Sequence, residues 1–418
     1  ITEEHLRKAG FATLDPIREL NLEDFNVVVP NITEMTKAAL ADSGLDNKAM
    51  VKCKNMFALG ICFYLYNRPE DHAKRYLDSK FAKKNPAIAE ANKRAIDAGY
   101  NYAANTHQFA NTYTVASGQM EKGTYRSISG NVATAWGLCA ASEKSGLPLF
   151  CGSYPITPAT VILEELAKRK DLGVKTVQAE DEIAGICTAI GASFAGNFAV
   201  TTTSGPGLSL KSEALGLAVM TELPLVVVDV QRGGPSTGLP TKTEQSDLQQ
   251  ALYGRNGESP VAVIAASMPS DCFHYAFEAG RLAMEHMTPV ILLTDGFIAN
   301  GSEPWRIPAM KDYPAITPPI VDEAPEGGFM PYVRNENLAR GWAFPGKTGL
   351  EHRVGGLEKD CVKGCISHDP SNHQKMVRTR AEKVAKAVDD IPAQAVWGAP
   401  EGDLLVVGWG GTRGHLQN

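Results

Sequence analysis

The sequence lacks the closely spaced cysteines that hold an iron–sulfur cluster. It has 8 cysteines in 418 residues, of which only Cys361 and Cys365 lie close together, and no C-x2-C-x2-C run occurs. Others, such as Cys62 and Cys139, lie in apolar stretches, where a free thiol packs like a small core residue. This usage indicates a reducing, cytoplasmic compartment.

Long hydrophobic runs and an excess of positive charge are also absent. No stretch approaches the roughly 18 apolar residues of a membrane span, and Leu223–Val230 has the length of one buried strand. The 47 acidic residues outnumber the 41 basic ones, for a net charge of −6. We therefore expect neither a membrane nor a nucleic-acid partner. The segment Ile1–His5 is polar and lacks an initiator Met, which argues against a secretory signal and suggests a partial chain.

The composition is that of a globular chain, with 44% apolar and 21% charged residues. In residues 1–120, helical apolar spacing occurs at Met35–Leu45, Met56–Asn67 and Ala87–Ala98, and strand signals are few. A polar connection over Ala104–Tyr125 follows. The sequence therefore predicts a helix-rich first domain over residues 1–120.

From residue 127 onward, short apolar runs alternate with helical segments. Runs that are apolar on both faces indicate a parallel sheet covered by helices on both sides, which predicts a doubly wound α/β domain over residues 121–303. The expected strands are Leu147–Gly152, Val174–Ala179, Phe198–Thr203, Leu223–Val230, Val261–Ala266 and Val290–Thr294. The expected helices are a segment capped by Asn131 and running to Lys144, Leu208–Glu222 and Cys272–His286.

The remaining residues are predicted to form a connecting segment and the start of another domain. Residues 304–400 are rich in proline and glycine, with one helix near His373–Val388. Residues 401–418 contain the segment Gly402–Trp409, with the apolar run Leu404–Val407 at its centre, which predicts the first strand of a further α/β domain.

Ligands of open parallel sheets bind outside the carboxyl ends of the strands, and four of the expected strands end in unusual sequences. After Leu147–Gly152, two prolines fix the backbone around a threonine hydroxyl. The same turn is also typical of an ordinary connection to a helix, capped by threonine and with proline in its first turn. The residues of this segment are Tyr154, Pro155, Ile156, Thr157 and Pro158.

The second strand end carries three acids, Glu180, Asp181 and Glu182, at the start of a helix. Acids in a first turn complement the helix dipole, which is a structural role. Alternatively, one desolvated carboxyl group has a raised pKa and exchanges a proton with a ligand.

The third strand end is the turn Thr202–Gly207, which includes Ser204 and Gly205. Its glycines expose backbone N–H groups as a phosphate-binding turn does, but it lacks the Walker lysine and the G-x-G-x-x-G spacing. A sharp turn that lets a substrate or subunit approach closely explains it equally well.

The fourth strand end is the loop that begins at Arg232 and continues with Gly233 and Gly234. A guanidinium group can bind a carboxylate through two parallel hydrogen bonds, and the glycines let a ligand approach. The alternative is a surface arginine at the head of a mobile loop. A single cation in a Gly/Pro/Thr loop at the carboxyl edge of a sheet favours anion capture.

A zinc site is a further possibility in the connecting segment. Four ligand-type residues occur within a short stretch, but their spacing fits no standard zinc framework, so zinc is the weaker hypothesis and these residues receive no role. They are Cys361, Cys365, His368 and His373.

Together, the motifs YPITP, AEDEIAG, TTTSGPG and RGGPSTGLPTKTEQSDL, in this order and spacing, resemble the alpha subunit of the 2-oxoacid:ferredoxin oxidoreductases, in particular the 2-oxoglutarate type. The resemblance covers about residues 125–415, and Lys54–Gly60 resembles the end of the gamma domain that is fused ahead of alpha in many members. It implies that residues 121–303 form a thiamine-binding domain of the pyrimidine type, preceded by a partial, helix-rich gamma-type domain.

The resemblance implies oxidative decarboxylation of 2-oxoglutarate, with coenzyme A as co-substrate, to succinyl-CoA and carbon dioxide, reversibly and with electrons passing to ferredoxin. Thiamine diphosphate would be shared with a beta subunit that carries magnesium and a [4Fe-4S] cluster, and the assembly would be a dimer of alpha–beta heterodimers. The absence of G-D-G followed by Asn, and of cluster cysteines, agrees with such a division.

The same resemblance assigns roles to individual residues. Glu180 matches the glutamate that hydrogen-bonds the aminopyrimidine ring of thiamine and promotes loss of the thiazolium proton. Thr157 and Arg232 match residues that hold the 2-oxoacid, and Thr241 matches a further threonine on the substrate side.

Two alternatives stay open at this point. The chain is similar enough to relatives acting on pyruvate, branched or aromatic 2-oxoacids for one of these to be its substrate. A non-catalytic scaffold of the same fold is the alternative from another class, although a scaffold needs none of Glu180, Thr157 and Arg232.

Overall fold

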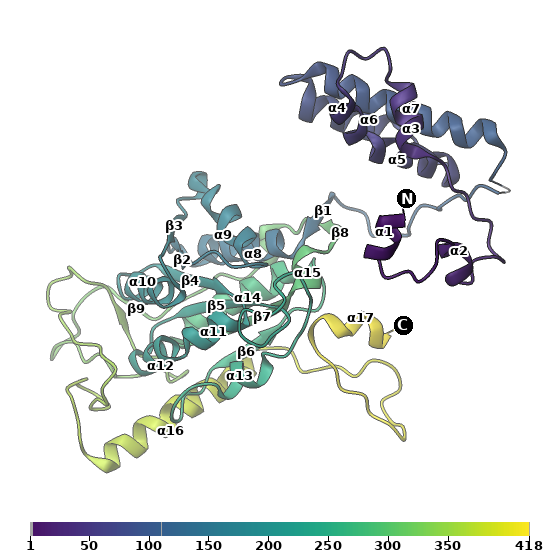
Figure 1. The fold of residues 1–418 in the computed structure, drawn as a ribbon. Coiled ribbons are helices and arrows are strands. Elements are labelled where there is room, and N and C mark those ends of the chain that lie inside the picture. Colours follow the sequence, from purple (N-terminus) through teal and green to yellow (C-terminus); the bar gives the residue numbers. More distant parts are fainter. Residues whose placement is uncertain (1–2, 110, 418) are drawn as a thin grey trace. The chain divides into compact units, whose positions relative to one another are not determined.

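The computed structural model describes residues 3–109 and 111–417, and the chain divides into two compact units, Ile1–Glu121 and Lys122–Asn418 (Figure 1). Each unit is described by itself. Among the described residues no helix is both long enough and apolar enough to span a bilayer.

The first unit is helical, as the sequence predicts. Its two main helices, α5 and α7, cross at glycines: a Cβ on Gly60 would lie 2.1 Å from the Ile96 carbonyl oxygen, and one on Gly99 would lie 1.9 Å from that of Phe57. Only glycine allows the two backbones to approach this closely. The elements are α1 (Glu3–Lys8), α2 (Pro16–Glu19), α3 (Ile32–Ala39), α4 (Asn47–Lys52), α5 (Lys54–Leu65), α6 (Asp71–Leu77), the π-turn Asp78–Ala82 and α7 (Pro86–Thr106).

The second unit is built on a 6-stranded sheet in the order β3-β2-β4-β5-β7-β6, with all neighbouring strands parallel. Each of the six strands predicted between residues 147 and 294 is present, which confirms the predicted doubly wound parallel sheet. The strands are β2 (Leu149–Ser153), β3 (Lys175–Gln178), β4 (Phe198–Thr203), β5 (Leu225–Gln231), β6 (Ala262–Ala265) and β7 (Pro289–Asp295).

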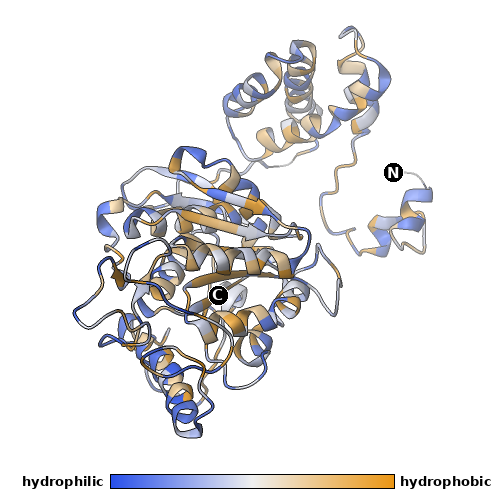
Figure 2. Cartoon of the chain, turned by 90° about the vertical axis from the view of Figure 1, so that its left-hand side faces the viewer, coloured by the Kyte–Doolittle hydropathy of each residue, from blue (hydrophilic) through white to orange (hydrophobic). Residues whose placement is uncertain are grey.

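Helices cover both faces of this sheet (Figure 1). Val226 and Val228 of β5 point to a core shared with α8, α9 and α14, whereas Leu225 and Val227 point to a core shared with α10 and α12. This period of two is why the run is apolar on both faces, and the central strands accordingly carry hydrophobic colours in Figure 2. The covering helices are α8 (Gly130–Ser145), α9 (Thr160–Ala167), α10 (Glu182–Phe194), α11 (Gly205–Leu210), α12 (Ser212–Thr221), α13 (Leu248–Tyr253), α14 (Asp271–His286) and α15 (Gly296–Asn300).

The structure differs from the sequence-based expectations at several points. Asn131 does not cap α8: it lies inside the helix, and its side-chain amide donates to the carbonyl oxygen of Pro158, 2.9 Å away, which ties α8 to the turn after β2. Pro158 itself precedes α9 rather than beginning it. The antiparallel pair β1 (Tyr125–Ser129) and β8 (Ser302–Arg306) was not expected, because neither segment is an apolar run.

Leu404–Val407, expected as a strand, forms none in the structure. Leu404 is 82% and Val407 84% exposed. A strand needs a neighbour for its backbone hydrogen bonds, and no strand in the described chain pairs with this segment.

Parts of residues 304–387 pack against the α/β unit, and Trp305 and Trp342 belong to its larger core, whereas residues 391–400 are exposed. This segment contains the short strands β9 (Ile320–Val321) and β10 (Trp342–Ala343) and the helix α16 (Pro370–Lys386). Single helical turns lie at Met310–Asp312 and Ala387–Asp390. A further turn, Gly410–Thr412, and α17 (Arg413–Gln417) follow.

A buried ionic network fastens this segment to the end of α12. Arg334 donates to both carboxylate oxygens of Glu222 at 2.6 Å, and Lys383 Nζ donates to one of them at 2.5 Å. Burial opposes the charge on Glu222, but Lys383 and Arg334 outweigh it and hold the pKa of this carboxyl group well below its usual range.

We expect Glu222→Gln to lower the free energy of unfolding by about 3–5 kcal/mol, because it leaves two buried cations without their anion. Urea unfolding at neutral pH, followed by tryptophan fluorescence, measures this loss, and all 5 tryptophans lie in the second unit. Glu326→Gln, on the exposed surface of the same segment, is the matched control. A loss no larger than that of the control would show that the network is not stabilising.

Candidate active site at the carboxyl edge of the sheet

The strands β2, β3, β4 and β5 are parallel neighbours, so the segments that follow them share one edge of the sheet. Direct contacts join the first three. The backbone N–H of Ala179 donates to the carbonyl oxygen of Ser153 at 2.9 Å, which links the ends of β3 and β2. Ser153 Oγ donates to the carbonyl oxygen of Thr202 at 2.7 Å, which links the ends of β2 and β4.

Glycines bring the remaining segments into contact. A Cβ on Gly207 would lie 2.9 Å from Cγ of Glu182, so the turn after β4 presses against the first turn of α10. A Cβ on Gly205 would lie 2.6 Å from Oδ2 of Asp247, which ends the loop after β5. The four segments singled out in the sequence therefore form one continuous surface.

Arg232 is buried at this edge, at the start of the loop after β5. It is 7% exposed; Nη1 donates to the carbonyl oxygen of Thr157 at 2.7 Å and Nη2 to that of Thr237 at 2.8 Å. The alternative of a surface arginine is therefore wrong. The structure brings Arg232 and the Thr157 backbone together, as expected for residues of one site.

These two bonds leave the guanidinium group unsatisfied. Its Nε is buried without a hydrogen-bond partner, and each Nη carries a second N–H. In the described part of the chain, the hydrogen bonds of this guanidinium go to those two carbonyl oxygens, and Arg232 forms no ion pair with a carboxylate. Because buried charges are normally paired, this arginine points to an anion supplied by a ligand.

Glu180 does not have the buried environment that its expected role suggests. It follows β3, and its side chain is exposed in this chain. The reason is topological: β3 is an edge strand, so no further strand covers this carboxylate. The neighbouring Asp181 has the structural role of a helix cap, accepting the N–H of Ala184 at 2.7 Å.

Of the other residues predicted for the site, some are buried and others are exposed. Ser204 is completely buried, and its Oγ has no hydrogen-bond partner among the described residues. Thr241 lies on the exposed part of the Arg232 loop. The buried positions are Pro158, Ser204, Gly205 and Gly233, the half-buried ones Pro155 and Ile156, and the exposed ones Tyr154, Thr157, Gly234 and Thr241.

Sequence reasoning missed three titratable groups at this edge, two of them buried and one half-buried. Lys211 is 0% exposed and its Nζ donates to the carbonyl oxygen of Glu182 at 2.6 Å; burial lowers the pKa of Lys211 to about 8. Asp229 and Asp247 also lie here, and Asp229 is 0% exposed. A charged residue inside an apolar run, as in LVVVDV and LSLKSEALGL, is the signal that could have identified Asp229 and Lys211.

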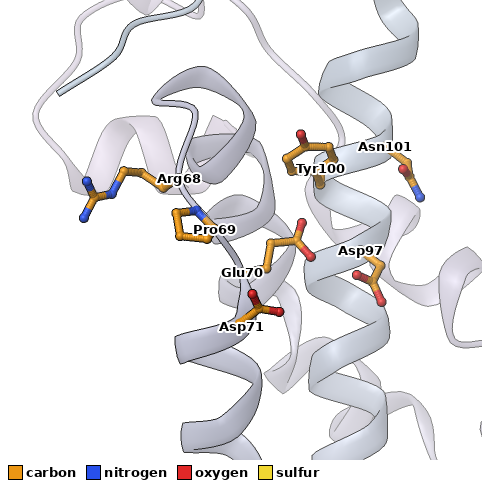
Figure 3. Close-up of a pocket in the computed structure, with 7 residues that line it drawn as sticks. All are labelled: Arg68, Pro69, Glu70, Asp71, Asp97, Tyr100 and Asn101. Carbon is orange, nitrogen blue, oxygen red and sulfur yellow. The ribbon is translucent and has the colours of Figure 1, made fainter. Parts of the chain in front are cut away.

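Two other parts of the chain are weaker candidates for a functional site than this edge of the sheet. In the described part of the chain, no group of three or more metal-ligating side chains occurs, so the cysteines and histidines at 361–373 form no zinc site; His373 instead contacts Glu358 at 2.8 Å. A cavity of about 340 Å³ in the first unit is lined largely by polar groups (Figure 3). Its acids Glu70 and Asp97 are already bridged by Lys74 at 2.6 and 2.5 Å.

Comparisons with known proteins agree with the geometry. Residues 143–366 match the family model "Pyruvate flavodoxin/ferredoxin oxidoreductase, thiamine diP-bdg", and residues 2–102 match "Pyruvate ferredoxin/flavodoxin oxidoreductase". The 2-oxoglutarate oxidoreductase subunit KorA of Mycobacterium tuberculosis is 52% identical over 99% of this chain and 63% of its own length. The 2-oxoglutarate synthase subunit KorA of Archaeoglobus fulgidus is 42% identical over 67% of this chain and 71% of its own.

A solved structure has the same fold. The 2-oxoglutarate:ferredoxin oxidoreductase of Magnetococcus marinus, with 2-oxoglutarate, coenzyme A and succinyl-CoA bound, aligns with a TM-score of 0.76 and 36% identity, over 87% of this chain and 62% of that one. The chain thus spans somewhat less than two thirds of the mycobacterial and Magnetococcus relatives. Its strand-end motifs, sheet topology and relatives agree, and the chain belongs to the 2-oxoacid:ferredoxin oxidoreductase family.

Proposed function

We propose that this chain is the alpha subunit of a thiamine-dependent 2-oxoglutarate:ferredoxin oxidoreductase, which converts 2-oxoglutarate and coenzyme A to succinyl-CoA and carbon dioxide. The observation that carries the proposal is the buried guanidinium of Arg232, which has no carboxylate partner in the described chain. The carboxylate of a 2-oxoacid satisfies it at the edge of the sheet where ligands bind. The choice of 2-oxoglutarate rests on the relatives named above.

The residues at this edge fit the aminopyrimidine end of thiamine diphosphate. Glu180 presents an exposed carboxylate at the end of β3, which can accept a ring N–H, and the unpartnered Ser204 Oγ lies in the neighbouring turn. Bound thiamine supplies the carbanion chemistry that no amino-acid side chain provides. Glu180 holds and returns a proton at its Oε atoms, while Arg232 and Thr157 orient the 2-oxoacid.

The other half of the site belongs, on this proposal, to a beta subunit that carries the diphosphate-bound magnesium and a [4Fe-4S] cluster and passes electrons to ferredoxin. Large apolar side chains stay exposed in the segments after five of the strands, where such a partner would cover them. They follow β2, β3, β4, β5 and β7 in turn, and are 37–63% exposed: Tyr154, Ile183, Leu210, Leu239 and Phe297. A dimer of alpha–beta heterodimers is the assembly we expect.

The test is an anaerobic assay of this chain co-purified with its partner, following viologen reduction with coenzyme A and a panel of 2-oxoacids. We expect reduction to be fastest with 2-oxoglutarate. Faster reduction with pyruvate or with a branched or aromatic 2-oxoacid would overturn the substrate assignment. No reduction by a complex shown to contain iron and thiamine would favour the non-catalytic scaffold.

A further inference from the structure

Asp229 and Asp247 form a pair of carboxyl groups beneath the Arg232 loop. Asp229 interrupts the apolar strand β5 and is 0% exposed; Asp247 lies at the other end of the loop, just before α13. The sheet register places Asp229 beside Thr203, and Asp247 lies against Gly205, two residues further along the same segment. The two carboxyl groups are near enough for Asp247 to act on the pKa of Asp229. Both oxygens of Asp229 and Oδ2 of Asp247 are buried without a hydrogen-bond partner among the described residues. Two neighbouring carboxyl groups can satisfy each other only if one carries a proton and donates it in a hydrogen bond to the other.

The surroundings of the pair keep that proton in place. The strands on either side bring Thr203 and Leu293 next to Asp229, both uncharged, and α11 brings Gly205 next to Asp247. The other charged group that acts on the pair is Glu244, an acid of the same loop. Burial, followed by Asp247, raises the pKa of Asp229 well above its usual range.

Asp247 contacts both the end of β5, where the loop leaves the sheet, and the turn after β4. Its backbone N–H donates to Oε1 of Gln231 at 3.0 Å, and Gln231 Nε2 donates to the carbonyl oxygen of Thr294 at 2.9 Å. Its carboxyl group presses against Gly205 in the turn after β4. Gln231 immediately precedes Arg232, so the contact that holds Asp247 also sets where Arg232 leaves the sheet.

We propose that Asp229 and Asp247 share one proton and together clamp the base of the 232–246 loop to the sheet and to the turn at Gly205, thereby positioning Arg232 for the 2-oxoacid carboxylate. The positioning role rests on the proposed function, whereas the clamp itself does not. Because the pKa of Asp229 in the folded chain is raised, the clamp is closed at low pH and opens as the pH rises through that pKa, when the buried carboxylate of Asp229 and the neighbouring carboxylate of Asp247 repel each other.

The test compares wild type, Asp229→Asn and Asp229→Leu in the purified full chain with its partner. Hydrogen–deuterium exchange of residues 233–246, corrected for the intrinsic pH dependence of exchange, reports the clamp without any turnover. Wild-type protection should fall by about 10- to 100-fold as the pH rises, the equivalent of one lost hydrogen bond to a charged group. Asp229→Asn, whose amide always donates, should stay protected at every pH. Asp229→Leu should be unprotected throughout.

Kinetics test the consequence for Arg232. The KM for the 2-oxoacid should rise with pH in wild type together with the loss of protection, and should not do so in Asp229→Asn. Equal pH profiles of wild type and Asp229→Asn, or full loop protection in Asp229→Leu, would overturn the clamp. If no 2-oxoacid were reduced, the proposed function would fail, and the exchange data would still decide the clamp. Asp247→Asn repeats the test from the other side should Asp229→Asn not fold.

Discussion

Glu180→Gln is expected to lower 2-oxoglutarate-dependent viologen reduction by roughly 100- to 10,000-fold, the range that positioned acid–base groups contribute. Glutamine keeps the size and hydrogen-bonding reach of the side chain but cannot hold or return a proton. Because Glu180 is exposed and makes no part of the core, the variant should fold and assemble as wild type does. Anaerobic kinetics of the complex measure the loss.

Glu164→Gln is the matched control for this change, since Glu164 lies on the exposed side of α9. Its activity should equal that of wild type. Undiminished turnover in Glu180→Gln, with bound thiamine verified, would remove Glu180 from the catalytic machinery.

Arg232→Lys is the second change with a large expected effect. Lysine keeps the charge but loses the planar fork, so it cannot hold the Thr157 and Thr237 carbonyl oxygens and a carboxylate at once. We expect kcat/KM for 2-oxoglutarate to fall by about 100-fold, which corresponds to one or two charge-assisted hydrogen bonds. Both KM and kcat should change, because the arginine orients the substrate as well as binding it.

Arg353→Lys, an exposed position in the segment after β10, is the control and should leave both constants unchanged. Titration with oxalate or another unreactive dicarboxylate separates binding from turnover. Equal affinity in wild type and Arg232→Lys would contradict the assignment of Arg232 as the carboxylate anchor.

The sheet could be predicted from the sequence because each strand is a short apolar run whose alternate residues serve two cores, as in β5. The candidate site could be predicted because parallel strands place their carboxyl ends together, so Thr157 and Arg232, 75 positions apart, meet through a hydrogen bond. The first inference depends on the local pattern of apolar residues. The second depends on the rule that parallel strands end at the same edge of a sheet.

What the sequence did not reveal depends on long-range contacts. The exposure of Glu180 follows from the place of β3 at the edge, which the strand pattern does not specify. The Glu222 network joins residues 112 and 161 positions apart, and no local signal marks Arg334 or Lys383 as its partners. The prediction of a strand at Leu404–Val407 was wrong because an apolar run alone does not provide a neighbouring strand to pair with.

The most direct test of the central claim is the rate at which the proton on the thiazolium carbon between nitrogen and sulfur exchanges with deuterated solvent. Acid-quenched complexes analysed by NMR give this rate for wild type, Glu180→Gln and Glu164→Gln, without requiring any 2-oxoacid. If this chain supplies the proton-handling carboxylate, exchange should slow by roughly 100-fold or more in Glu180→Gln alone. Equal exchange in all three proteins would contradict the placement of half the active site at this edge.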